Sequence, residues 1–386
     1  MSLASSFHSV SSTAPCRVGI LGFGIVGSAV ARRLTGRGRV RGVELTHICD
    51  RRASQKREKL PADSGIAWTD AIDDLLQSDV DVIVETMGGV DPAGPWIRRA
   101  LLAGKSVVTA NKQVIARDGP PLLVLAARQG RQLRFEAAVG GVMPIVRAIG
   151  EGLAGDRLRR IVAILNGTTN AVLSRMEATG CSLEAALADA RARGYAESDP
   201  SLDLEGADAA AKLAILCALA FGVRLDPSRI ETRSASAVDA ADVERARQRG
   251  GAIRQIACAA YDHQRSTLTA WVAPIVVPHA SIFAQTVGAQ NAAVISGEHA
   301  GDVTISGAGA GGDATAVAVI SDILAIARDR AAIVPAPVLS TPRTIVGLET
   351  DLATTTFNAE FAEHAEKSLL CGLSGFCVDR LGAEAV

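Results

Sequence analysis

The sequence predicts an α/β fold in which a parallel-sheet domain is joined to a mixed α+β domain. Aromatic residues make up only 3% of the 386-residue chain, so smaller aliphatic side chains must fill the core, as in folds that pack helices on parallel sheets. From Arg17, short apolar runs alternate with longer amphipathic ones, which is the pattern of βαβ units. After about Gly140 this alternation gives way to helical stretches followed by strand-like runs.

The first domain is predicted from five strand-like runs separated by helical runs. The strands are expected at Arg17–Leu21, Val43–Cys49, Val80–Glu85, Ser106–Thr109 and Gln132–Glu136. The helices are expected at Ile25–Thr35, Thr69–Gln77, Pro95–Ala103 and Pro120–Gln129. Right-handed crossovers would wind these elements into one open sheet.

The second domain is predicted to begin with a strand at Leu158–Leu165. Helices follow at Thr168–Ala178, Leu183–Arg193 and Gly206–Phe221, and strands at Ile253–Tyr261, Leu268–Val277, Ala292–Ser296 and Asp302–Ser306. A last helix, Ala314–Arg328, is expected to pack back on the first domain. We predict a parallel-sheet domain from residues 16–140 with 307–340, a second domain from 141–306, a disordered tail at 1–15 and a C-terminal tail at 341–386.

Charge and cysteine content favour a small-molecule partner and a reducing compartment. The 40 basic and 41 acidic residues leave a formal net charge of −1, which gives no electrostatic footprint for nucleic acid or a membrane surface. No apolar run is long enough to cross a bilayer. The cysteines form no CxxC pair, so we expect them to be reduced in a cytoplasmic protein; they are Cys16, Cys49, Cys181, Cys217, Cys258, Cys371 and Cys377.

A glycine-rich turn marks the first candidate site. The run Gly22-Phe23-Gly24-Ile25-Val26-Gly27 follows the first predicted strand and opens the first predicted helix. Gly22 would permit the tight turn, Gly24 would let the backbone approach a pyrophosphate, and Gly27 would let the helix pack closely on the strand. The helix N-terminus adds free N–H groups and partial positive charge. This context favours a nicotinamide dinucleotide site over a structural turn without a ligand.

The residues after the second predicted strand leave the choice of dinucleotide open. Asp50 could accept hydrogen bonds from the ribose hydroxyls of NAD, whereas Arg51 and Arg52 could bind the 2′-phosphate of NADP. The arginines could equally belong to a solvated loop. Thr86, just past another strand end, lies where a contact to the nicotinamide ribose is expected.

An acidic stretch before an apolar helix forms the second candidate site. It runs from Gly194 to Lys212, and Asp208 and Lys212 are spaced so that they share one helix face. On spacing alone, an ordinary surface ion pair is the favoured interpretation of these two residues.

Five motifs in one order make this sequence resemble the homoserine dehydrogenases. The first is the stretch Gly194–Lys212, and the second is Gly104–Lys112, which ends in Asn-Lys. The others are the glycine-rich loop Glu136–Pro144, the run Leu165–Asn170 with its Asn-Gly-Thr-Thr-Asn core, and the late glycine-rich turn Gly307–Ala316. The resemblance covers about Val18 to Arg328.

The resemblance implies reversible, NAD- or NADP-dependent reduction of L-aspartate 4-semialdehyde to L-homoserine. It implies that Glu197, Asp203 and Asp208 hold the substrate, with Gly194 and Tyr195 in the same signature. Lys112 would transfer the proton, and Lys212, anchored by Asp208, would share the electrostatic role. The chemistry agrees, because aldehyde reduction develops negative charge on oxygen and an amino-acid substrate carries an ammonium group.

The resemblance also implies further ligands and an assembly. Lys112 and Gly309 would complete the cofactor pocket. A sodium ion would be held chiefly by backbone carbonyls at Glu136, Val139, Gly141 and Met143, a chemically reasonable ligand set for a hard cation; a tight turn between the domains is the alternative. The family is usually dimeric through the second domain, so we expect a homodimer.

Two departures and two competing functions complete the predictions. We expect no regulatory ACT domain of the kind found in many bacterial members in the short stretch after Leu339, and His279-Ala280 stands where many relatives have His-Pro. A reductase of another amino-acid semialdehyde or 2-oxo acid would keep the glycine turn but vary the acidic stretch. A cofactor-binding regulator without catalysis is disfavoured by the presence of Lys112, Asp208 and Lys212.

Overall fold

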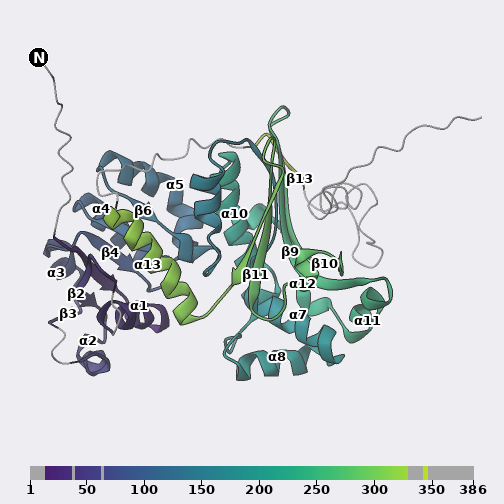
Figure 1. Ribbon diagram of the computed structural model, residues 1–386, viewed down its shortest axis with the longest axis horizontal. Helices are drawn as coiled ribbons and strands as arrows, with labels where there is room; N and C mark the ends of the chain where they lie inside the picture. The colour runs from purple at the N-terminus through teal and green to yellow at the C-terminus, as the bar shows by residue number, and fades with distance from the viewer. Residues whose placement is uncertain (1–13, 37–39, 62–64, 329–341, 347–386) are drawn as a thin grey trace, which may run out of the picture. The chain divides into compact units, whose positions relative to one another are not determined.

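The computed structural model describes residues 14–36, 40–61, 65–328 and 342–346, which fall into two compact units (Figure 1). Among the described residues, unit 1 contains 14–36, 40–61, 65–114, 120–135 and 315–328, and unit 2 contains 115–119, 136–314 and 342–346. The sequence-based domain limits remain predictions. Most of the two predicted tails, together with Cys371 and Cys377, lies outside the described residues.

Unit 1 is built on a six-stranded sheet with the order β3-β2-β1-β4-β5-β6, in which all neighbouring strands are parallel. This confirms the predicted α/β class with an open parallel sheet, and the strand order is of the Rossmann type. The strands are β1 (Cys16–Leu21), β2 (Val43–Cys49), β3 (Ala67–Thr69), β4 (Val82–Glu85), β5 (Ser106–Thr109) and β6 (Leu133–Arg134). The helices are α1 (Ile25–Thr35), α2 (Ala53–Lys56), α3 (Ile72–Gln77), α4 (Ala93–Leu102), α5 (Lys112–Arg128) and α13 (Gly312–Arg328), with a 3₁₀ turn at Arg57–Lys59.

The central strands of unit 1 are short and buried on both faces. Every residue of β4 and β5 is buried, which requires cover on both sides of the sheet and explains their Val-rich sequences. The register places Cys49, Leu21, Glu85 and Thr109 in one row at the carboxyl ends of four adjacent strands. The residues that follow this row therefore emerge together at one edge of the sheet.

Two helix starts in unit 1 differ from the sequence prediction by three or more residues. Helix α3 begins at Ile72, because Thr69 ends strand β3 and its hydroxyl accepts a hydrogen bond from the Ala71 N–H. Helix α5 begins at Lys112 instead of Pro120. A proline usually marks a helix start, but here the Asn111 side chain caps the helix nine residues before Pro120.

Unit 2 is built on a mixed sheet with the order β12-β11-β7-β9-β10-β13, and β8 also pairs with β10. Its strands are β7 (Leu158–Ile164), β8 (Glu231–Thr232), β9 (Gly251–Asp262), β10 (Thr267–Pro278), β11 (Gln290–Gly297), β12 (Asp302–Ala308) and β13 (Thr344–Val346). Its helices are α6 (Ile145–Arg147), α7 (Gly167–Thr179), α8 (Leu183–Ala192), α9 (Ser201–Leu204), α10 (Ala207–Phe221), α11 (Ala240–Gln248) and α12 (Ile282–Gln285). Short 3₁₀ or π turns occur at Glu136–Ala138, Ala148–Gly152, Pro227–Arg229 and Ala235–Ala237.

The core of unit 2 surrounds the long strand β9. Strands β9 and β10 form an antiparallel hairpin of twelve residues each, and β10, β9 and β11 stand as long arrows in Figure 1. Helices α7, α10 and α11 pack on β9. The first nine residues of β9, up to and including Ala259, are all buried. The mixed sheet with its helices confirms the predicted α+β second part of the fold.

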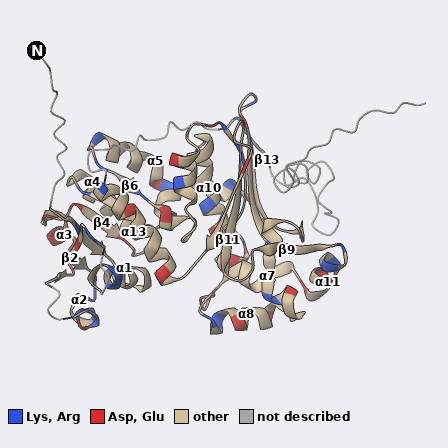
Figure 2. Ribbon diagram, in the orientation of Figure 1, with Lys and Arg blue, Asp and Glu red and all other residues tan. Residues whose placement is uncertain are grey.

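Charged residues of both signs are distributed over both units (Figure 2). Among the described residues, no helix is both long enough and apolar enough to span a bilayer. The five cysteines that the structure describes, Cys16, Cys49, Cys181, Cys217 and Cys258, are all free thiols.

Candidate functional site

The glycine-rich turn of unit 1 needs each of its three glycines for a different reason. Gly22 has a φ of 94°, a conformation that other residues rarely adopt, and a Cβ on it would lie 2.8 Å from the Met87 side chain. A Cβ on Gly27 would lie 2.1 Å from the Gly22 carbonyl oxygen. Around Gly24, in contrast, there is open space. Gly22 and Gly27 therefore make the turn, and Gly24 leaves room for a ligand at the N-terminus of α1.

The Asp50 carboxylate ties the end of β2 to the glycine turn. One oxygen accepts hydrogen bonds from the Phe23 N–H at 2.7 Å and the Lys56 ammonium at 2.6 Å, and the other accepts from the Arg52 N–H at 2.9 Å. Burial raises the pKa of Asp50, but the hydrogen bonds from Lys56, Phe23 and Arg52 outweigh it and leave the pKa lowered. The Arg51 and Arg52 side chains are exposed beside this pair.

Thr86 and Lys112 follow the next two strand ends. The Thr86 hydroxyl donates to the Gly22 carbonyl at 2.8 Å, so it braces the glycine turn. Lys112 is the first residue of α5, directly after the cap Asn111. The parallel sheet thus brings the glycine turn, Asp50, Thr86 and Lys112 to one edge, which is where ligands bind in open α/β sheets.

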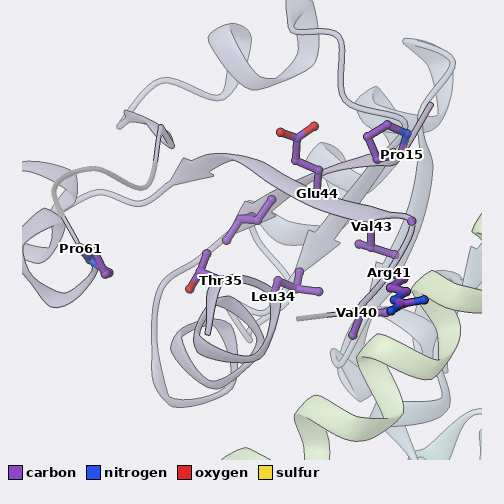
Figure 3. Close-up of a pocket in the computed structure, with 10 residues that line it drawn as sticks. Pro15, Leu34, Thr35, Val40, Arg41, Val43, Glu44 and Pro61 are labelled. Atoms are coloured by element: carbon purple, nitrogen blue, oxygen red, sulfur yellow. The ribbon is translucent and has the colours of Figure 1, made fainter. Parts of the chain in front are cut away.

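A cavity of about 620 Å³ lies at the opposite edge of the same sheet (Figure 3). It is lined by the end of α1, including Leu34 and Thr35, and by the start of β2, including Val43 and Glu44. Because these are the amino ends of the strands, this cavity is separate from the glycine turn.

Unit 2 contains a compact cluster of two carboxylates, an amide and an ammonium group. The Asn166 amide nitrogen donates to Asp203 at 2.7 Å and to Asp208 at 2.9 Å. The Lys212 ammonium contacts Asp208 at 2.9 Å and donates to the Leu165 carbonyl at 2.7 Å. We call Asn166, Asp203, Asp208 and Lys212 the carboxylate–lysine cluster.

The Asp208–Lys212 pair is buried, which corrects the interpretation that spacing alone favours. Their side chains are 5% and 12% exposed, so this is not an ordinary surface ion pair. Burial of two charges is costly unless further hydrogen bonds satisfy them. Asn166 and the Leu165 carbonyl provide those hydrogen bonds.

The other predicted substrate residues lie in the loop before α9. Gly194, Tyr195 and Glu197 are exposed, and the Tyr195 carbonyl accepts a hydrogen bond from Thr168 at 2.7 Å. The structure therefore brings Asp203, Asp208 and Lys212 together and leaves Glu197 on an exposed loop.

Gly309 follows β12 in unit 2 and packs against a fully buried amide. A Cβ on Gly309 would lie 2.4 Å from the Asn291 side-chain oxygen. Within the described part of the chain, neither side-chain polar atom of Asn291 has a hydrogen-bond partner. A Cβ on Gly141 would lie 2.6 Å from the carbonyl oxygens of both Ala308 and Gly309. Backbone carbonyls thus crowd around the loop that contains Gly141.

The predicted cation loop can offer backbone oxygens, while the Glu136 carboxylate is already engaged by backbone N–H groups. That carboxylate accepts hydrogen bonds from the Val146 and Arg147 N–H groups at 2.9 and 2.8 Å. The carbonyl of Met143 accepts the Ile145 N–H at 2.8 Å, and a carbonyl has a second lone pair. Among the described residues, no group of three or more His, Cys, Asp or Glu side chains could hold a metal.

Known protein families match both units of the chain. The family model described as "Homoserine dehydrogenase, NAD binding domain" matches residues 22–136, and the one described as "Homoserine dehydrogenase" matches residues 144–324. The homoserine dehydrogenase of Corynebacterium glutamicum is 37% identical over 81% of this chain and 72% of its own length. That of Mycobacterium tuberculosis is 39% identical over 82% of this chain and 73% of its own length.

The chain belongs to the homoserine dehydrogenase family.

Solved structures of this family share the fold. A homoserine dehydrogenase from Thiobacillus denitrificans superimposes with a TM-score of 0.79 at 32% identity, over 87% of this chain and 80% of the other. A hyperthermophilic archaeal homoserine dehydrogenase mutant in complex with NADPH gives a TM-score of 0.68 at 29% identity, over 82% and 98%. This chain is therefore an NAD(P)-dependent oxidoreductase that acts on a CH–OH group, as the five motifs predict.

Several residues at the two candidate sites are not found by the sequence motifs. Lys56 forms an ion pair with Asp50. Its position one helical turn after Arg52 could have indicated this pair from the sequence. Asn166 lies in a quoted motif, but only the fold shows that it bridges two carboxylates. Glu85 and Asn291 are buried polar residues that local sequence does not distinguish from core residues.

Proposed function

We propose that this chain catalyses the reversible reduction of L-aspartate 4-semialdehyde to L-homoserine. The carboxylate–lysine cluster is the observation that carries the proposal. Its buried ammonium group can stabilise the negative charge that develops on the aldehyde oxygen, and its carboxylates can bind the substrate ammonium group. The dinucleotide supplies the hydride when it is bound.

The proposed roles follow from how each group is held. Asp208 orients Lys212, and Asn166 orients Asp208 and Asp203. Glu197, Gly194 and Tyr195 are proposed to contact the substrate from the loop before α9. Lys112, at the N-terminus of α5, is the proposed proton-transfer group. A positioned acid or base of this kind typically contributes about 10²-fold to 10⁴-fold in rate.

We propose that NADP is preferred over NAD. Lys56 neutralises the Asp50 carboxylate, which would otherwise repel a 2′-phosphate, and Arg51 and Arg52 add two exposed positive charges. The sites proposed for the dinucleotide are Gly22, Phe23, Gly24, Ile25, Val26, Gly27, Asp50, Arg51, Arg52, Thr86, Lys112 and Gly309. The test is kcat/KM with each cofactor. We expect Lys56→Ala to lower the ratio for NADP over NAD by about tenfold, the size of one lost charge-assisted hydrogen bond, and Lys59→Ala on the neighbouring turn to leave it unchanged.

We also propose that backbone oxygens of the Glu136–Met143 loop bind a monovalent cation. The support is the crowding of carbonyls about Gly141 and the engagement of the Glu136 side chain elsewhere. Sodium would then raise activity or thermal stability more than an equal concentration of tetramethylammonium, a cation too large for such a loop. Equal effects of the two salts would contradict this proposal.

The assay that tests the main proposal follows NAD(P)H formation with L-homoserine. Serine, threonine and malate serve as competing alcohols, because each keeps only part of the homoserine structure. We expect turnover with homoserine at least about 10²-fold above the others. A substrate that lacks one of the homoserine groups would leave polar groups of the cluster without a hydrogen-bond partner. No turnover of homoserine with either cofactor would refute the proposal. Preferential turnover of another alcohol would instead support a related semialdehyde or oxo-acid reductase.

A homodimer in the cytoplasm completes the proposal. The free thiols of the described cysteines and the absence of a bilayer-spanning helix among the described residues support this location. A solution mass measured by light scattering tests the assembly, and twice the 39.9 kDa of the chain is expected.

A further inference from the structure

Glu85 is a buried carboxyl group that the proposed chemistry does not use. It is the last residue of β4 and is 0% exposed. It accepts hydrogen bonds from the Thr109 hydroxyl, the Met87 N–H at 2.7 Å, the Gly88 N–H and the Asn111 side chain. All four partners are donors, and a carboxylate is a pure acceptor. Burial raises the pKa of Glu85, and these hydrogen bonds oppose that effect.

Thr109 and Asn111 extend this contact into a network. The Thr109 hydroxyl donates to Glu85 and accepts the Asn111 N–H at 2.9 Å. The Asn111 side chain donates to the Gly89 carbonyl at 2.6 Å and accepts from the Val114 N–H at 3.2 Å. Thr109 is 0% and Asn111 4% exposed, so water does not compete for these hydrogen bonds.

The network joins three backbone segments that meet at the dinucleotide edge of the sheet. It fixes the loop after β4, where Gly88 and Gly89 have φ values of 76° and 72°. It fixes the end of β5 through Thr109, and the first turn of α5 through Asn111. Thr86 begins the first of these segments, and Lys112 directly follows Asn111. Neither residue can then shift without breaking hydrogen bonds to Glu85 or Asn111.

We infer that Glu85 is a positioning residue that fixes Lys112 relative to Thr86 through Thr109 and Asn111. The inference rests on the proposed function, because it assigns Lys112 to the chemical step. A displacement of about 1 Å from a mutation away from the chemistry can cost about 10²-fold in rate. Loss of the network should therefore lower kcat more than dinucleotide affinity, because most of the residues proposed to bind the dinucleotide lie outside the network.

Three substitutions separate a hydrogen-bonding role from simple packing. Glu85→Gln keeps the shape of the side chain, but its amide N–H₂ group would face the N–H and O–H groups that now donate to the carboxylate. Thr109→Val keeps the shape and removes the hydroxyl, whereas Thr109→Ser keeps the hydroxyl and removes a methyl group. Ser106→Ala is the matched control, because Ser106 is buried at the other end of β5 and its hydroxyl accepts the Gln132 N–H at 3.2 Å.

We expect Glu85→Gln and Thr109→Val to lower kcat by at least about tenfold, a loss within the range caused by a misplaced catalytic group. The Kd for NADP should change less than about threefold. Thr109→Ser and Ser106→Ala should each keep more than about a third of the wild-type kcat. Equal losses in Thr109→Val and Thr109→Ser, or an unchanged kcat in Glu85→Gln, would overturn the inference. If Glu85→Gln does not fold, the difference in kcat between Thr109→Val and Thr109→Ser tests the inference.

Hydrogen exchange gives a second measurement that needs no substrate. In Thr109→Val, the amides of residues 86–89 and 111–114 should exchange faster together, whereas in Ser106→Ala they should not. Faster exchange in only one of the two segments would overturn the inference. Turnover of homoserine by the wild-type protein tests the proposed function separately, so the two ideas can fail independently.

Discussion

The two sites of this protein are built in opposite ways. In unit 1, the glycine turn, Asp50, Thr86 and Lys112 emerge from successive strands of one parallel sheet, so backbone register places them. In unit 2, the carboxylate–lysine cluster is placed by side-chain hydrogen bonds between segments up to 47 residues apart in the chain. The comparison teaches that a backbone-built site tolerates side-chain changes that a side-chain network does not.

The largest effect is expected from removing the cluster's ammonium group. Lys212→Met should lower kcat by at least about 10²-fold, because a positioned charge or proton donor contributes that much. It should also lower the free energy of unfolding by about 3–5 kcal/mol, since Asp208 is left as a buried unpaired charge. Steady-state kinetics and denaturant unfolding measure the two effects.

A double variant separates these effects. Lys212→Met with Asp208→Asn should recover most of the stability, because no buried charge remains, but not the kcat. Recovery of kcat would show that Lys212 acts only by stabilising the fold. Lys112→Ala should also lower kcat by about 10²-fold if Lys112 transfers the proton.

The next largest loss of activity is expected from changing Asn166, the amide that bridges Asp203 and Asp208. Asn166→Asp keeps an oxygen that can accept the Thr169 N–H, which caps α7, but it replaces the donor to Asp203 and Asp208 with a third carboxylate. We expect kcat/KM for homoserine to fall by about 10²-fold, as is typical when a group supporting a site is lost. The cofactor Kd serves as the control, and an equal loss in it would point to general disruption.

Two glycine variants test the backbone-built site and should have smaller effects on turnover. Gly27→Ala places a Cβ against the Gly22 carbonyl and should lower the melting temperature. Gly24→Ala faces open space and should leave the melting temperature within about 2 °C, a shift below about 1 kcal/mol. It should nevertheless weaken NADP binding by about tenfold, because its methyl group occupies the path of the pyrophosphate. Unchanged binding in Gly24→Ala would refute the proposed cofactor position.

The smallest effect concerns pH. Asp50 has a lowered pKa in the folded protein, so its ion pair and backbone hydrogen bonds contribute stability above its unfolded pKa. That contribution is lost as the pH falls through the lowered pKa. The difference in unfolding free energy between wild type and Asp50→Asn should therefore be largest near neutral pH and shrink in acid. A difference that grows in acid would contradict the assigned direction.

The sequence predicted unit 1 well because its signals are local. The alternation of apolar runs, the glycine spacing and the acidic residue at a strand end can each be recognised from a few neighbouring residues. The two helix starts that differ most from the prediction have a physical reason, since a cap such as Asn111 or a threonine that ends a strand depends on a single hydrogen bond. Pro120 lies inside α5, although a proline ordinarily predicts the start of a helix.

The sequence by itself determined the α/β class, the dinucleotide turn and the residue types that a dehydrogenase of a hydroxy amino acid requires. Periodicity and motif spacing are properties of the chain. Only the tertiary structure decided that Asp208 and Lys212 are buried, that Asn166 bridges two carboxylates, and that Lys56 neutralises Asp50. Burial and hydrogen-bond partners depend on residues distant in sequence, and local spacing does not record them. The same is true of Glu85, whose partners come from the loop after β4, from β5 and from the cap of α5.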